Sequence, residues 1–149
     1  MSGLENTQLA VQAMEKRDFA AFERLINDDF MIYTSLPTPL GIRGFIEVQQ
    51  ALMDAIPDWK FNASNFKEEN DNKVTYTQQV TGTHTGTLHL ESIGIPVMPP
   101  TGKSIRLPEE KVIVTLRDDK ASRVEIPLVP GGSVEGLLAQ IGIKIPHNA

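Results

Sequence analysis

The sequence predicts an α+β fold, in which three helices from the N-terminal half pack on one face of a strongly curved antiparallel sheet. Helical periodicity dominates the chain before Pro57, and patterns of period 2 dominate the part that follows it. One more short helical pattern closes the chain. Strands that cluster after helices are typical of this class, in which one face of the sheet is covered and the other is left open.

The helices are expected where apolar residues recur every three or four positions. These segments are residues 4–16, 19–26 and 45–56. Asp18 can cap the second helix, and Pro57 helps to end the third. Between them, NDD at 27–29 breaks the helical pattern, and FMIYTSL at 30–36 is predicted to form a strand before a loop.

The strands of the C-terminal half show period 2 and are separated by turn signals. They are expected at residues 59–69, 73–90, 103–107, 111–117 and 121–129. The third and fourth form either one strand or two strands broken near Pro108. The short final helix lies in GGSVEGLLAQIGI, where Ser133 can cap it and Gly142 can end it.

The stretch TYTQQVTGTHTG, residues 75–86, indicates which face of the long strand points inward. Val74, Tyr76 and Val80 share one parity, which is therefore expected to face the helices. The opposite parity is almost all threonine, which tolerates water and is expected on the outer face. His84 then lies inside, and a shift of one residue would reverse this assignment.

Composition restricts the class of protein. The 149 residues are predicted to form one domain, 1–149, with 40% hydrophobic residues and a net charge of -5. That charge argues against nucleic acid and anionic membrane surfaces as partners. The chain has no cysteine, no apolar leader pattern and no apolar run of membrane length, so we expect a cytoplasmic protein. Its histidines, His84, His89 and His147, lack metal-type spacing, and no metal is expected.

Several motifs, in order along the chain, resemble the SnoaL-like polyketide and ester cyclases of the nuclear transport factor 2-like superfamily. The closest matches are GTHTG at 82–86, PPTGK at 99–103 and GLLAQIG at 136–142. The resemblance implies a cone-shaped sheet wrapped on three helices around a blind pocket. It also implies a homodimer or higher homo-oligomer that associates through the outer sheet face. The loop at 87–98 departs from the usual family form in being longer, and it is expected to lid the pocket or to narrow its mouth.

In the cyclases, an acidic residue on a later strand removes a proton from an apolar carbonyl compound, aided by a histidine on the long strand and without any cofactor. His84 matches that histidine. The acid position falls on Lys111 or near Val112, and neither is a carboxylate. Glu109 and Glu110 are the candidates nearby, and adjacent strand residues point to opposite faces. Glu109 is favoured because it shares parity with Leu107, and Glu110 replaces it if a bulge shifts the phase.

Aromatic and amide side chains complete the expected pocket. Tyr33, Trp59 and Tyr76 suit its walls, although such rings are more often core residues with a tethered polar end. Gln78 is a buried amide that needs partners, and a ligand oxygen is one option. Two functions follow: cofactor-free acid/base chemistry of the cyclase, isomerase or hydrolase type, or a non-catalytic binding or oligomerisation module that has lost the family acid.

Overall fold

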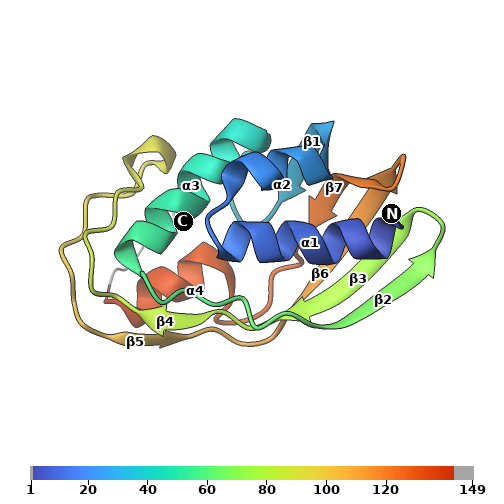
Figure 1. Cartoon of the computed structure of the whole chain (residues 1–149). Helices are drawn as coiled ribbons and strands as arrows, with labels where there is room; N and C mark the ends of the chain where they lie inside the picture. The colour runs from blue at the N-terminus through green and yellow to red at the C-terminus, as the bar shows by residue number, and fades with distance from the viewer. Residues whose placement is uncertain (1, 143–149) are drawn as a thin grey trace.

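The computed structural model describes residues 2–142 and confirms the predicted α+β class (Figure 1). The helices are α1 (Gly3–Glu15), α2 (Phe19–Leu25), α3 (Ile42–Ala55) and α4 (Ser133–Gln140), with a 3-10 helix, η1 (Glu91–Ile93). The strands are β1 (Ile26–Tyr33), β2 (Ser64–Asn70), β3 (Lys73–Gln78), β4 (Thr81–Thr83), β5 (Ser104–Arg106), β6 (Glu110–Arg117) and β7 (Lys120–Glu125). His147 lies outside the described residues.

The five-stranded sheet has the order β1-β7-β6-β3-β2, and β4 pairs with β5 in a second, two-stranded sheet. All neighbours in both sheets are antiparallel except β1, which runs parallel to β7 at the edge. The first three helices lie along one side of the five-stranded sheet, and α4 sits between α3 and β4 (Figure 1). The helices and the sheet enclose the core between them.

Helix α2 begins as the sequence predicts, but the strand after it begins earlier. The Asp18 carboxylate accepts a hydrogen bond of 3.1 Å from the N–H of Ala21 and so caps α2. Strand β1 then begins at once with Ile26, so NDD belongs to the strand. Asp29 is held there by Arg117 at 3.3 Å and Ser122 at 3.0 Å. Residues 27–30 have no paired partner in β7, because the register passes from Ile26–Ala121 directly to Met31–Arg123. The NDD segment is therefore an irregular part of β1.

The long strand predicted at 73–90 is divided into β3 and β4, and it ends at Thr83. Its inward parity is as predicted at Val74, Gln78, Val80 and His84, which are all buried. Two neighbours depart from it, since Tyr76 is only partly buried and Thr75 is buried on the opposite parity. The chain also breaks near Pro108, between β5 and β6, as one of the two alternatives anticipated. These two breaks lie opposite each other, where the five-stranded sheet gives way to the two-stranded one.

The final helix differs from the prediction at its start. Gly132 is the N-cap of α4 and Ser133 is its first residue, so no side chain of this segment caps the helix. Gly142 follows the helix with a φ of 96°, the left-handed conformation that glycine allows, and ends it as expected. The side chain of Gln140 accepts from the N–H of Arg106 at 2.9 Å and donates to its carbonyl at 2.8 Å, which fixes α4 to β5.

Candidate functional site

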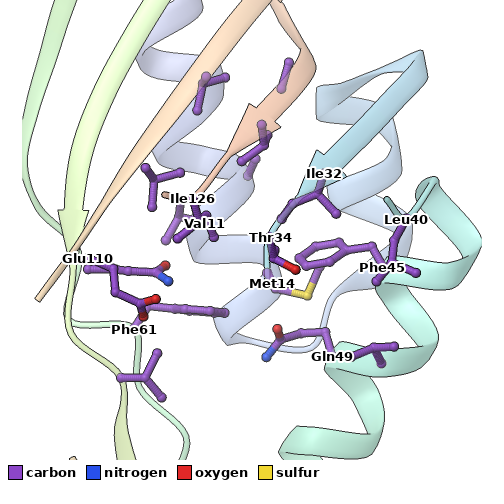
Figure 2. A pocket seen from close by; sticks show the side chains of 18 of the residues that line it. Val11, Met14, Ile32, Thr34, Leu40, Phe45, Gln49, Phe61, Glu110 and Ile126 are labelled. Carbon is purple, nitrogen blue, oxygen red and sulfur yellow. The ribbon is translucent and has the colours of Figure 1, made fainter. Parts of the chain in front are cut away.

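The apolar interior is not filled completely. A cavity of about 160 Å³ lies between the helices and the sheet, and α1, α2, α3, α4, β1, β3, β6 and β7 all contribute to its wall. Most of the lining is aliphatic or aromatic, and polar groups are few (Figure 2). An apolar engineered cavity of about 150 Å³ is large enough for benzene, so this one has room for a ligand of about one ring. The loop at 87–98 contributes no residue to the wall.

Glu110 supplies a carboxylate to this cavity. It is the first residue of β6, is 2% exposed, and is the one buried carboxylate in the part of the chain that the structure describes. Its Oε2 accepts a hydrogen bond of 3.1 Å from the backbone N–H of Ser133 at the start of α4. In Figure 2 its side chain reaches the cavity next to Phe61.

The prediction that Glu109 faces the pocket is wrong, because the side chain of Glu109 is exposed. The cause is one extra residue in the segment that joins β5 to β6. The chain advances three residues from Gln78 to Thr81, whereas their partners, Glu110 and Arg106, are four residues apart. An extra residue on one strand is a bulge, and it reverses the facing of everything after it. Glu110 therefore points inward.

Burial raises the pKa of the Glu110 carboxyl above its ordinary value. Taking a carboxylate out of water disfavours its charged form. The hydrogen bonds from the Ser133 N–H and the Gln78 side chain lower the pKa, and so oppose part of this effect. The carboxyl is therefore less acidic than a solvated one and, once ionised, a stronger proton acceptor.

Three of the residues predicted for the pocket wall line the cavity, and one does not. Gln78 faces Glu110 across the β3–β6 pair. Tyr76 and Trp59 also line the cavity, and burial raises the pKa of the Tyr76 hydroxyl above its ordinary range. Tyr33 is absent from the wall, because its ring packs under the guanidinium of Arg123 at 4.0 Å from the ring centre.

His84 is buried, as its parity predicts, but it is absent from the cavity wall. Its Nδ1 lies 2.9 Å from Oγ1 of Thr101 and accepts from the Thr101 N–H at 3.3 Å. The backbone N–H of His84 donates to the Lys103 carbonyl at 2.9 Å, and the backbone carbonyl of His84 accepts from the N–H of Gly102 at 2.8 Å. Burial lowers the pKa of the ring, which favours the neutral imidazole. These contacts join the GTHTG and PPTGK motifs.

Two cavity groups have buried donors without a partner among the described residues. They are Nε2 of Gln49 and Nε1 of Trp59. Gln49 was missed by the sequence reading, although a signal for it exists. It lies one helical turn after Phe45 and one before Leu52, on the buried face of α3. A polar side chain on an apolar helix face marks a buried amide that needs partners.

The described residues contain neither a metal-type cluster of three or more acidic, histidine or cysteine side chains nor a helix long and apolar enough to cross a membrane. The location in the cytoplasm, the single domain over 1–149 and association through the outer sheet face stay predictions.

Comparison with solved structures defines the fold as cystatin-like. IdmH from Streptomyces antibioticus, a proposed polyketide cyclase, has a TM-score of 0.71 at 19% identity and covers 96% of this chain and 100% of its own. A SnoaL-like polyketide cyclase from Agrobacterium tumefaciens has a TM-score of 0.67 at 15% identity over 95% and 99% of the two chains. An uncharacterised cystatin-fold protein from Novosphingobium aromaticivorans has a TM-score of 0.62 at 18% identity. The match covers 86% of this chain and 99% of that protein.

The sequence also matches a family directly. The family model for the SnoaL-like polyketide cyclases matches residues 5–124. The chain therefore belongs to this family, as its motifs suggested, and membership supports a small-molecule role of the cyclase type. No curated protein matches the chain.

Proposed function

We propose that the cavity binds an apolar carbonyl compound and that Glu110 acts as the proton acceptor in cofactor-free chemistry on it. The observation that carries this proposal is the position of Glu110, a buried carboxylate in an otherwise largely apolar cavity wall. A carboxyl whose pKa is raised by burial is a better base near neutral pH than a solvated one. Family membership is consistent with such chemistry.

The reaction step needs no external oxidant or reductant. Glu110 would take a proton from the carbon next to the carbonyl, so that the C–H bond breaks and an O–H bond forms on the carboxyl. The electron pair moves onto the carbonyl oxygen and forms an enolate. Where a C=C bond is conjugated with the enolate, return of the proton at the far carbon of that bond is an isomerisation. Attack of the enolate carbon on a second carbonyl closes a ring, and the alkoxide that forms takes the proton back from the Glu110 carboxyl. The largely apolar wall has a lower dielectric than water, which strengthens electrostatic interactions with the enolate.

Exchange of ligand protons with solvent tests this step without knowledge of the natural substrate. We would incubate phenylacetone and acetophenone with the protein in D₂O and follow loss of the α-proton signals by NMR. Glu110→Gln should reduce protein-dependent exchange by a factor of about 100 or more, which is the usual contribution of a general base. Glu109→Gln is the matched control, because its exposed side chain should leave exchange unchanged.

Exchange that persists in Glu110→Gln, or is lost equally in Glu109→Gln, would contradict the assignment of the base. Melting temperatures of both variants would show whether a loss reflects unfolding.

The hydrogen bond from the Ser133 N–H to Glu110 also favours a second function, that of a non-catalytic binding module. In that case Glu110 serves to complete the start of α4, and the cavity only holds a ligand. Ketones that bind in the cavity of the wild-type protein without any accelerated exchange would favour the module. Exchange that depends on Glu110 would favour the enzyme.

A further inference from the structure

The cavity wall contains two donor groups that the proton-transfer step does not use. Nε2 of Gln49 and Nε1 of Trp59 are both buried without a hydrogen-bond partner, and the two residues are 5% and 8% exposed. Leaving a buried donor unpaired is costly, and most such groups in folded proteins have a partner. Both residues line the same cavity.

The arrangement of polar groups in the cavity is asymmetric. Gln49 projects from α3 and Glu110 from β6, and they face the cavity from opposite walls (Figure 2). Glu110 already accepts from Ser133 and Gln78. The unpaired Trp59 indole has a donor and no acceptor. The cavity thus contains a proton acceptor on one wall and unused N–H groups elsewhere.

We propose that Gln49 and Trp59 select the substrate by donating hydrogen bonds to a neutral acceptor oxygen of a one-ring ketone, ester or quinone. This inference rests on the proposed function, because it requires the cavity to be the substrate site. A carbonyl oxygen accepts without bringing a proton of its own, so it satisfies the donors and leaves nothing unpaired. A hydroxyl would need an acceptor for its own proton, and a carboxylate would lose its hydration on entering a largely apolar cavity. The same donors would stabilise negative charge as it develops on that oxygen.

A pair of ligands with the same shape isolates the contribution of the oxygen. Acetophenone and α-methylstyrene differ in having C=O or C=CH₂ at one position. Binding would be measured by isothermal titration calorimetry, and the carbonyl stretching frequency of bound ¹³C-labelled acetophenone by infrared spectroscopy. We expect wild-type protein to bind acetophenone about tenfold more tightly than the alkene, a ratio that corresponds to about 1.4 kcal/mol.

Two variants remove the donors, and the ratio of affinities for two ligands of the same shape cancels the space that Trp59→Phe adds to the cavity. Gln49→Met and Trp59→Phe should each reduce the preference for the ketone by about threefold and should move the carbonyl frequency towards its value in an apolar solvent. Gln50→Met is the matched control, because Gln50 lies on the same helix and is exposed. It should leave both the preference and the frequency unchanged.

A readout without any ligand keeps the proposal open to contradiction. Replacing an unpaired buried amide by methionine removes a desolvated group, so Gln49→Met should raise the melting temperature of the free protein. A lower melting temperature would show that the amide holds the fold together and would overturn the proposal. Equal binding of the two ligands by the wild-type protein, no measurable binding of either, or an unchanged preference in both donor variants would also overturn it.

These outcomes are separate from a failure of the proposed function. If the donors do not select for oxygen, exchange that depends on Glu110 still supports the proton acceptor. If ketone selection is present but Glu110→Gln exchanges like the wild type, the base assignment fails while the donor assignment stands.

Discussion

The carboxylate of Glu110 accepts a 3.1 Å hydrogen bond from the backbone N–H of Ser133, and this bond joins the first residue of β6 to the first residue of α4. No side chain of its own segment caps α4, so Glu110 satisfies one of the N–H groups that every helix leaves free at its start. The positive end of the helix dipole also favours a negative charge at this point. The charge on Glu110, the candidate base, therefore contributes to the stability of α4.

The raised pKa of Glu110 predicts how stability depends on pH. The folded protein retains the proton at pH values where the unfolded chain has lost it, so the folded state binds more protons in that window. The free energy of unfolding then falls as pH rises from the ordinary glutamate value through the higher folded pKa, and this contribution is constant above it. Glu110→Gln cannot ionise, and its amide oxygen can still accept from Ser133. Its free energy of unfolding should therefore improve relative to the wild type as pH rises.

Urea unfolding at a series of pH values between about 4 and 8 measures this difference. Glu109→Gln serves as the control, because Glu109 is exposed and should show no comparable trend. A constant difference between Glu110→Gln and the wild type across the series would show that burial does not perturb this carboxyl.

His84 is expected to contribute to stability and not to the affinity of the cavity. Its ring is fully buried and is held by the hydroxyl and N–H of Thr101, yet it is absent from the cavity wall. His84→Leu should lower the free energy of unfolding by about 1–3 kcal/mol, because the partly buried hydroxyl and N–H of Thr101 lose their partner. Acetophenone affinity should be unchanged. The measurements are urea unfolding and calorimetric titration.

His89→Leu is the control for this prediction, since that histidine is exposed and its replacement should change neither quantity. Loss of ligand binding with unchanged stability in His84→Leu would instead assign to His84 the direct role that the family resemblance implies.

The close approach of the GTHTG motif to α3 predicts a strong effect at Gly86. A side chain added there would clash with the backbone carbonyl of Asp54, and the N–H of Gly86 donates to the Ala55 carbonyl at 2.9 Å. Neither backbone can move without disturbing the end of the helix. Gly86→Ala should therefore lower the free energy of unfolding by about 1–3 kcal/mol, the usual range for overpacking.

Gly44→Ala provides the contrast, and thermal denaturation of both variants measures the difference. A Cβ at Gly44 would meet the flexible side chain of Leu40 at 3.2 Å, and alanine favours the helix by about 1 kcal/mol. This variant should be as stable as the wild type or more stable. Equal melting temperatures for the two variants would contradict the steric argument at Gly86.

Local patterns were sufficient wherever a short segment determines its own environment. The alternation in TYTQQVTGTHTG predicts the inward face of β3, and Val74, Gln78 and Val80 are buried there. The threonines have the opposite parity, and Thr77, Thr81 and Thr83 are only partly buried, whereas Thr75 is buried and bonds to Glu69. The cap at Asp18 is another local feature, since donor and acceptor are three residues apart. Such features require no information about distant parts of the chain.

The facing of the acidic residues could not be obtained in this way. Counting from Leu107 requires a regular strand, but the bulge between β5 and β6 adds one residue and brings Glu110 inward in place of Glu109. Pro108 signals an irregularity without giving its length. Tyr33 shows the same limit, because its environment depends on Arg123 of β7, ninety residues further along the chain.

The amino-acid sequence alone was enough to establish the α+β class, the inward parity of the long strand, the family resemblance and the presence of a carboxylate near the expected acid position. Only the tertiary structure decided that Glu110 faces the cavity, that His84 connects two motifs away from its wall, and that Gln49 and Trp59 carry unpaired donors. The physical reason is that periodicity and capping act over a few neighbouring residues. The register across a bulge, the volume of a cavity and the partners of a buried polar group depend on segments that are brought together only when the whole chain packs.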